Sequence, residues 1–389
     1  SLKAVAALLF LIGVLLLWRN RPPRKELVNA MVLGILIFGY AFQARWNRLL
    51  LNSGQNVVFG RTDKTASASA KPDPDPVTKV HLVFFEEHPQ GGFTTVVQLD
   101  HAKSQPRHML LTNGKFEGVD DLQEQGYAQI SFAAIPSQFT PGFGRALQIG
   151  LGTGQSAYAL ERMGFRQVEI AEYAPGVVHA AAQWFQNVNG NVLSAPNVRL
   201  YLEDGRNLLL LDRSERFDLI SVEITSVWFA GATNLYSREF YELAKSRLKP
   251  GGAFQQWLQL HHITPRELTV EIGTLRSVFP YVSLWSSGGQ GMLVASGRPQ
   301  TLTPERRSYM IGHLSSLEGV PEGKQAEVQH QVFDSQLLDS EGVDRLLRTS
   351  PHVLNTDHNR WIEYATPRYN WTDNDGAGNF AWIRTFESR

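Results

Sequence analysis

The stretch that decides the fold is ALQIGLGTG, residues 146–154. Its apolar first half is typical of a buried strand, and it enters a turn with glycine at Gly150, Gly152 and Gly154 before a helical pattern over 156–164. Glycines let the backbone approach a ligand closely, and a helix N-terminus favours polar or anionic groups. This turn predicts a ligand site, although Gly-x-Gly-x-Gly alone is a weak signal.

Alternating strand and helix patterns continue beyond the turn. Strands are expected at 168–173, 198–204, 217–223 and 253–260, helices at 176–188 and 237–248, and an edge hairpin at 281–287 and 291–296. Repeated β-α-β units imply a mainly parallel sheet with helices on both faces. The expected fold class is therefore α/β, with a Rossmann-like domain of the S-adenosylmethionine-dependent transferase type.

Polar residues follow the second and third strands at the sheet edge where open α/β sheets bind ligands. Glu172 lies 18 residues beyond Gly154 and can accept hydrogen bonds from ribose hydroxyls. Asp204 can accept from the exocyclic amine of adenine, and Gly205 leaves room for the ring. The glycine spacing lacks the extra residue of the dinucleotide motif, which favours an adenosyl ligand without a pyrophosphate.

The N-terminal segment contains two apolar runs, 4–18 and 27–42, separated by a basic Pro-Pro turn within 19–25. A membrane-spanning helix needs about 20 apolar residues, with a range of about 17–25, so both runs are short for a span. Because Trp18, Tyr40 and Trp46 lie where interfacial aromatic residues would, and the flanking arginines can snorkel, we predict a transmembrane hairpin within 1–52 that contacts membrane lipid. The alternative is a buried soluble hairpin, and a signal peptide fits poorly because the basic residues follow the apolar core.

The side of the membrane is ambiguous from the charges. Four basic residues in 19–25 would place that loop in the cytoplasm and the following domain outside, whereas Arg45 and Arg48 oppose this orientation. The chain begins at Ser1, so helices before it would change the count of spans. We expect an inner or plasma membrane location with the main domain on the cytoplasmic face.

Composition divides the rest of the chain and excludes some functions. Residues 53–78 read as a linker, 79–140 as a β-rich subdomain with an Asn113-Gly114 turn, 141–300 as the Rossmann-like domain, and 301–389 as an extension packed on the core. The formal net charge is zero, which offers no electrostatic reason for a nucleic-acid partner. There is no cysteine, and no histidine–carboxylate motif points to a metal.

Glu223 ends the fourth strand, where a carboxylate would lie near the reactive centre of the cofactor. Such a group can orient an amine and take its proton during attack, and the alternative is a surface acid that caps a loop. The loop that follows contains Ser226 and Trp228, and Trp228 is a candidate contact for an acceptor substrate.

The runs 146–154, 168–178, 203–209, 234–252 and 354–368 together resemble the spermidine synthase-like (polyamine aminopropyltransferase) family. The similarity is greatest to the branch in which this domain follows transmembrane helices. The resemblance implies an N-terminal β-subdomain and transfer of an aminopropyl group from decarboxylated S-adenosylmethionine to a diamine. It also implies that Gly150, Gly152, Glu172 and Asp204 contact the nucleoside and that Glu223 occupies the place of the catalytic Asp.

The chain departs from the family pattern where the acceptor binds. The family has Asp-x-x-Asp at the fourth strand end, whereas this chain has Glu223 and Ser226, and serine supplies no charge for a diammonium substrate. In place of the family's Tyr-His-Glu element lie Asp120 and Asp121, which either bind an amine or begin a solvated helix. The pair His261-His262 either borders the site or is an ordinary loop.

Three functions are compatible with these residues. The first is an enzyme that transfers an aminopropyl or related alkyl group from S-adenosylmethionine or its decarboxylated form to an amine. The second is a methyltransferase, which needs the same nucleoside site without a diamine pocket. The third is a catalytically degenerate domain that serves as a structural or assembly subunit, with membrane-protein partners or a second copy of itself.

Overall fold

The computed structural model describes residues 10–13, 23–43, 47–52, 75, 77–88, 92–121, 126–211, 216–224, 226–227, 229, 231–317, 320, 322–366 and 376–387. The chain divides into two compact units, Ser1–Leu51 and Asn52–Arg389.

The first unit contains helix α2 (Arg24–Gln43) and the short helix α3 (Arg48–Leu51). Gly34 of α2 lies close to the Phe10 ring, with 3.0 Å between that ring and the position of an added Cβ. Within the described residues, no helix is both long enough and apolar enough to span a membrane. The expected transmembrane hairpin is therefore not shown, and most of the first apolar run lies outside the described residues.

The second unit begins with a four-stranded antiparallel sheet, ordered β1-β2-β3-β4. Its strands are β1 (Val77–Glu87), β2 (Phe93–His101), β3 (Arg107–Thr112) and β4 (Lys115–Val119). Asn113 and Gly114 both have positive φ, at 52° and 79°, which is the backbone that a tight Asn-Gly hairpin requires. This turn presents the start of β4 at the edge of the sheet.

A larger mixed sheet forms the centre of the unit. Its eight strands, in spatial order, are β12 (Gln336–Leu338), β10 (Tyr281–Ser287), β11 (Gln290–Ser296), β9 (Leu248–Leu258), β8 (Phe217–Val222), β5 (Arg145–Ile149), β6 (Gln167–Ala171) and β7 (Val198–Tyr201). The five strands from β9 to β7 are parallel, and β11, β10 and β12 continue the sheet in antiparallel pairing. The α/β Rossmann-like fold expected from the sequence is confirmed.

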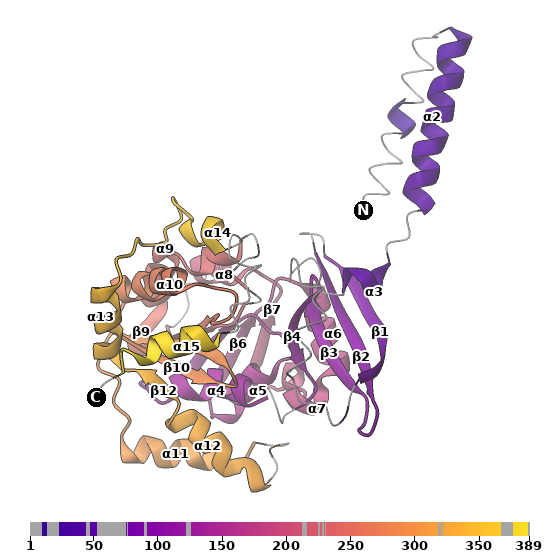
Figure 1. Ribbon diagram of the computed structural model, residues 1–389. Helices are drawn as coiled ribbons and strands as arrows, with labels where there is room; N and C mark the ends of the chain where they lie inside the picture. The colour runs from indigo at the N-terminus through magenta and orange to yellow at the C-terminus, as the bar shows by residue number, and fades with distance from the viewer. Residues whose placement is uncertain are drawn as a thin grey trace. The chain divides into compact units, whose positions relative to one another are not determined.

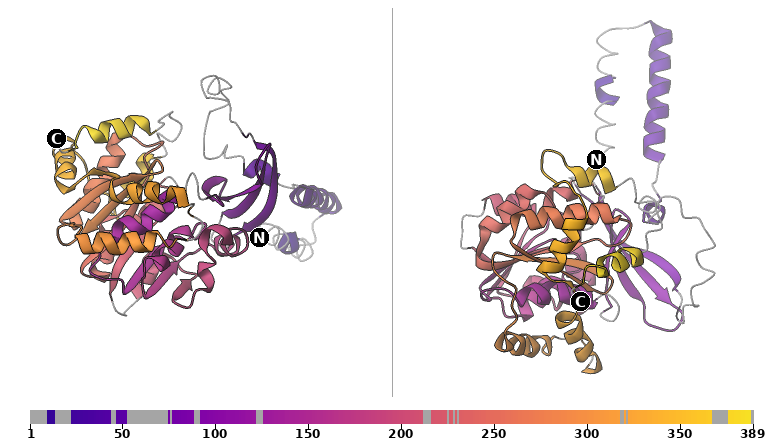
Figure 2. Two further views of the ribbon diagram at one scale, coloured as in Figure 1. Left: turned by 90° about the horizontal axis from the view of Figure 1, so that it is seen from below. Right: turned by 60° about the vertical axis from the view of Figure 1, so that its left-hand side comes forward.

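Helices cover both faces of this sheet (Figures 1 and 2). They are α4 (Gly126–Ser137), α5 (Gln155–Arg162), α6 (Pro175–Trp184), α7 (Gln186–Asn189), α8 (Gly205–Leu211), α9 (Arg238–Arg247), α10 (Pro265–Val278), α11 (Pro304–Leu314), α12 (Gln325–Phe333), α13 (Ser340–Thr349), α14 (Trp361–Ala365) and α15 (Ala377–Arg384), with short 3₁₀ turns at Val192–Ser194, Ala232–Leu235 and Glu322–Lys324. One apolar core joins α4, α5, α11 and α12 to the sheet, and a second joins α9, α10, α13 and α14.

Helices α4 and α10 are among those that were not expected from the sequence. α4 is buried almost throughout, so its sequence has no polar face and no 3.6-residue period to detect. α10 begins with a capping box in which Thr264 and Glu267 satisfy each other's backbone N–H groups. The Thr-x-x-Glu spacing was therefore the available signal for α10.

The second core contains a buried acid with unusual surroundings. Glu271 on α10 is fully buried, and neither of its carboxyl oxygens has a hydrogen-bond partner within the described part of the chain. Its burial, reinforced by the nearby Glu267, raises the pKa of the Glu271 carboxyl well above its ordinary value. Folding therefore favours the protonated, neutral form of the Glu271 carboxyl.

Replacing Glu271 by glutamine should stabilise the protein in a pH-dependent way. The pKa of Glu271 is higher in the folded protein than its unfolded value of 4.5. The contribution of this group to wild-type stability is therefore fully present below pH 4.5 and decreases as the pH rises towards the folded pKa. Relative to wild type, the free energy of unfolding of Glu271→Gln should rise by about 1.4 kcal/mol per pH unit over that interval. Urea unfolding at pH 5 and pH 8 measures the difference, with exposed Glu341→Gln as control. Equal effects of Glu271→Gln at both pH values would contradict it.

Candidate functional site

The glycine turn after β5 is held against the end of β8. Gly150 has a φ of 90°, and a Cβ added there would lie 1.9 Å from the Glu223 carbonyl oxygen, so no other residue fits. Gly152 has a φ of 54° and open space where a Cβ would project. A Cβ added at Gly154 would lie 3.1 Å from the Asn189 side chain, and Gly154 is the N-cap residue of α5 but does not line the cavity.

Glu172 follows β6 and is tied to the glycine turn. One carboxyl oxygen accepts from the Leu151 N–H at 3.0 Å, and the other accepts from the Ala174 N–H at 2.8 Å. Burial raises the pKa of Glu172, while these backbone donors oppose that rise because they stabilise the anion. The residue expected to bind a ribose therefore faces the same space as the glycine turn.

Asp204 and Gly205 follow β7 at the rim of that space. Asp204 accepts a hydrogen bond from the Asn207 N–H at 2.9 Å and so caps α8. A Cβ on Gly205 would lie 2.4 Å from Ile149 Cγ2, which means that the glycine permits close packing of α8 on β5. Glycine is therefore required at position 205 for packing, in addition to the expected role of leaving room for an adenine ring.

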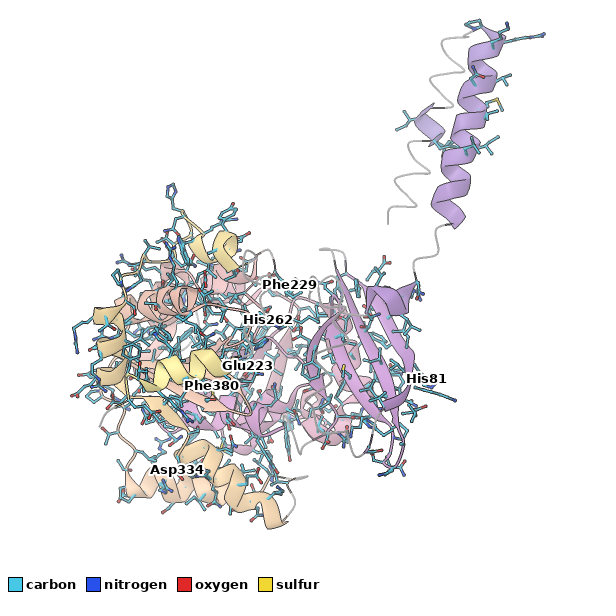
Figure 3. The ribbon with its side chains drawn as sticks, in the orientation of Figure 1. His81, Glu223, Phe229, His262, Asp334 and Phe380 are labelled. Atoms are coloured by element: carbon cyan, nitrogen blue, oxygen red, sulfur yellow. The ribbon has the colours of Figure 1, made fainter. Side chains whose placement is uncertain are left out.

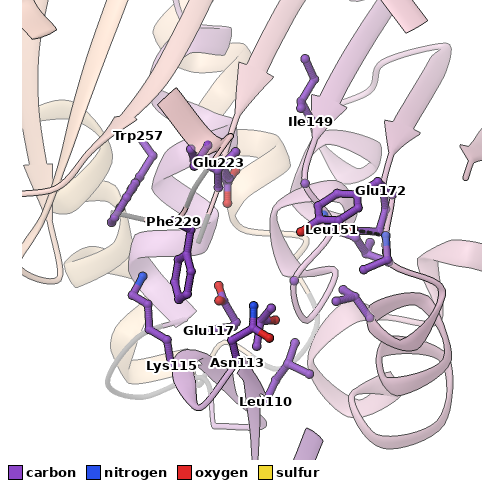
Figure 4. A pocket seen from close by; sticks show the side chains of 18 of the residues that line it. Leu110, Asn113, Lys115, Glu117, Ile149, Leu151, Glu172, Glu223, Phe229 and Trp257 are labelled. Atoms are coloured by element: carbon purple, nitrogen blue, oxygen red, sulfur yellow. Dashed lines mark hydrogen bonds between the residues drawn. The ribbon is translucent and has the colours of Figure 1, made fainter. Parts of the chain in front are cut away.

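These strand ends open into a cavity of about 1350 Å³. The β3–β4 hairpin closes its other side, and the close-up shows Lys115 and Glu117 facing Glu223 across the space (Figure 4). In the view of the second unit, Glu223, Phe229 and His262 are seen towards its centre, whereas His81 and Asp334 are seen towards its outline (Figure 3).

Glu223 lines this cavity, and hydrogen bonds hold its carboxyl group in place. Its Oε1 accepts from Gln148 Nε2 at 2.8 Å, and its Oε2 lies 2.8 Å from the Ser156 hydroxyl. Burial raises the pKa of Glu223 to about 7, and the hydrogen bonds from Ser156 and Gln148 oppose the rise. A carboxyl with this pKa can accept or release a proton near neutral pH.

Ser156 also links Glu223 to a second acceptor. The Ser156 hydroxyl lies 2.8 Å from Gln129 Oε1, and it has a single hydrogen to donate. When Glu223 is ionised, this hydrogen serves the carboxylate. When Glu223 is protonated, the acid can donate to the Ser156 oxygen while Ser156 donates to Gln129, so both protonation states are accommodated.

Comparison with known proteins gives the family context of this geometry. Residues 127–287 match the family model of the spermine/spermidine synthase domain. These residues are therefore similar to a spermidine synthase domain. The match spans β5 to β10, and therefore includes the glycine turn and Glu223.

Relatives of known sequence agree with this domain assignment. The polyamine aminopropyltransferase of Nitrosomonas europaea is 32% identical over 139 residues, which cover 36% of this chain and 42% of that protein. The polyamine aminopropyltransferase 2 of Pseudomonas aeruginosa is 37% identical over 102 residues, covering 26% and 28% of the two chains. The chain thus spans less than half the length of these relatives. The comparisons do not support the narrower expectation of the membrane-fused branch, because the family match begins at residue 127.

A solved structure supports the fold of the spermidine synthase-like domain. The crystal structure of a spermidine synthase in complex with the transition-state analogue AdoDATO aligns with a TM-score of 0.51 and 15% identity. The alignment covers 69% of this chain and 87% of that chain. At this identity the similarity establishes the fold.

The structure does not bring every candidate residue of the spermidine synthase-like domain to the cavity. Ser226 is fully buried, and its hydroxyl donates to Gln259 Oε1 at 2.6 Å instead of facing the cavity. Trp228 lies outside the described residues. Glu223 is thus the member of the Glu223–Ser226 pair that reaches the site.

Asp120 and Asp121 have structural partners elsewhere in the β-sheet subdomain. Asp120 accepts from the His108 backbone N–H at 2.8 Å and lies 2.7 Å from His108 Nδ1. Asp121 pairs with Arg107 Nη1 at 2.8 Å. Neither aspartate lines the cavity, so the expectation that they bind an amine finds no support in their positions.

Several cavity residues were not singled out from the sequence. Lys115 and Glu117 follow the Asn-Gly turn, and Trp257 lies in β9. Only their positions in the sequence could have indicated them, because residues after the hairpin turn and near the end of a parallel strand both reach the edge of the sheet where the cavity lies.

His261 and His262 also line the cavity. Burial, together with the charge of Lys115, lowers the pKa of His261 to about 4. Among the described residues, no group of three or more acids and histidines is arranged so that it could bind a metal ion.

Replacing Ser156 by alanine should raise the pKa of Glu223 further. The substitution removes a donor that stabilises the carboxylate, and a hydrogen bond to a charged group is worth about 1.5–3 kcal/mol, which corresponds to about one pKa unit or more. Carbon-13 NMR of glutamate-labelled protein, with Glu223→Gln to assign the resonance, measures the shift. A pKa that is unchanged or lower in Ser156→Ala would refute the assigned role of the hydroxyl.

Proposed function

We propose that this protein is a transferase that moves an aminopropyl or related alkyl group from an S-adenosyl donor to an amine acceptor. The observation that carries the proposal is the position of Glu223. This carboxyl has a pKa of about 7 and lines the same cavity as the glycine turn and Glu172. A titratable acid with a raised pKa that lines a large cavity is typical of a functional site. The family match supports the same reaction class.

The described residues fit a nucleoside donor of this kind. The open space at Gly152 admits a ligand next to the backbone, and Glu172 presents a carboxyl held by two backbone N–H groups. Asp204 at the rim supplies an acceptor for a base amine. Decarboxylated S-adenosylmethionine or S-adenosylmethionine itself would supply a carbon activated by an adjacent sulfonium.

Glu223 would act as the base for the acceptor. A neutral amine forms a bond to the activated carbon as the carbon–sulfur bond breaks, and the sulfur keeps the electron pair as a thioether. The nitrogen then carries a proton in excess, which passes to Glu223. Gln148 and Ser156 hold the carboxylate for this transfer, and Ser156 accommodates the protonated acid afterwards.

Binding and rate measurements on the full chain test this proposal. Calorimetry should show binding of methylthioadenosine and a preference for the decarboxylated donor over S-adenosylmethionine. Glu223→Gln should retain nucleoside binding and lower kcat by about 10²–10⁴-fold because the base is lost. The kcat of wild type should rise with pH through about 7, as Glu223 ionises, and this limb should vanish in the variant.

Other results would select the other functions. Preference for S-adenosylmethionine, with methyl transfer, would replace the proposal with a methyltransferase. Absence of binding to all three nucleosides would leave the structural or assembly role. An unchanged kcat in Glu223→Gln would remove Glu223 from the mechanism.

We also propose that residues 1–52 attach the protein to a lipid membrane. The support is a stripe on α2 with side chains at intervals of three and four residues, which are 51–64% exposed: Val28, Met31, Val32, Ile35 and Leu36. An apolar helical stripe of this spacing can enter the acyl boundary of a bilayer.

Charges placed on this stripe should release the full chain from vesicles. In co-sedimentation with phospholipid vesicles, Val32→Asp combined with Ile35→Asp should lower the apparent affinity at least about tenfold, because a buried aliphatic side chain contributes about 1.5–3 kcal/mol. Asn29→Asp, an exposed polar position on the same helix, serves as the matched control. Equal sedimentation of the double variant and wild type would disprove the attachment.

A further inference from the structure

The charges around Glu223 bear on the kind of amine that the cavity accepts. Among the described residues that line it, Lys115 is the only lysine or arginine. The close-up places Lys115 and Trp257 on one side of Glu223, with Glu172 and Leu151 on the other (Figure 4). The residues expected to bind the nucleoside lie on the side of Glu172. The side on which Lys115 lies is therefore left for the acceptor.

Lys115 is held there by an aromatic ring and an acid. Its Nζ lies 5.2 Å from the centre of the Trp257 ring, a geometry in which a cation is attracted to the ring face. The ring is fixed because Trp257 Nε1 donates to Gln290 Oε1 at 3.0 Å. Glu117 follows two residues later on β4, lines the same cavity, and is close enough for its charge to act on the Lys115 ammonium.

The charge of Lys115 depends on this acid. Burial lowers the pKa of Lys115, and the Glu117 carboxylate opposes that change because its negative charge favours the ammonium form. An ammonium between an aromatic face and a carboxylate has the surroundings that the distal ammonium of a diamine would need. In this chain the protein itself supplies that ammonium.

We propose that the acceptor is a monoamine, because Lys115 occupies with its own ammonium the place beside Trp257 and Glu117 where a second ammonium would bind. This inference rests on the proposed function, since it concerns the acceptor of the same site. A diamine would bring a second positive charge towards Lys115, and like charges brought together at a binding site disfavour the complex strongly. Ser226, directed to Gln259, supplies no compensating acid.

Two amines with the same four-carbon chain, one with a single amino group and one with two, test the inference on the full chain saturated with methylthioadenosine. By calorimetry, n-butylamine should bind wild type at least about tenfold more tightly than 1,4-diaminobutane. In Lys115→Met, the Glu117 carboxylate becomes available, and the affinity for 1,4-diaminobutane should rise at least about tenfold. Lys115→Gln provides a second form of the same test should the methionine variant fail to fold.

The double variant Lys115→Met with Glu117→Gln is the matched control. It should lose the gain in diamine affinity, because the gain comes from the released carboxylate. Tighter binding of 1,4-diaminobutane than of n-butylamine to wild type, or no gain in either single variant, would overturn the inference while leaving the proposed function intact. Failure of methylthioadenosine to bind would instead overturn the proposed function, and this inference with it.

Discussion

The close approach of Gly150 to the Glu223 carbonyl is the constraint on which the site depends. A Cβ at position 150 would lie 1.9 Å from that oxygen, so glycine alone lets the ends of β5 and β8 meet. The Gly150 N–H donates to Ala171 O at 2.9 Å, and the Glu223 N–H donates to Ile149 O at 2.9 Å. Three neighbouring strands are thereby locked at one edge, and the side chains that follow them point into a common cavity.

The same packing explains the acid chemistry of the cavity. Glu172 is held by backbone donors, whereas Glu223 is held by side chains that serve either protonation state. Both carboxyls have a raised pKa because they are buried. The different donors suit Glu172 to holding a ligand and Glu223 to exchanging a proton, although the two residues have identical side chains.

Much of the α/β fold and the nucleoside half of the site could be predicted locally. Strand, glycine turn and helix occur consecutively at 145–162, and Glu172 and Asp204 follow the next strands, so topology alone brings them together. The acceptor half could not be predicted this way. Lys115 and Trp257 are far apart in the sequence, and they meet only because the β3–β4 hairpin folds over the edge of the sheet.

The sequence by itself determined the Rossmann-like domain, its glycine turn and the acids at the strand ends, because each follows from a short-range pattern and the parallel order of strands. Tertiary structure decided which polar residues serve the cavity. Asp120 and Asp121 are occupied by His108 and Arg107, and Ser226 turns to Gln259. Hydrogen bonds between distant segments direct these side chains, and such partners leave no local signal in the chain.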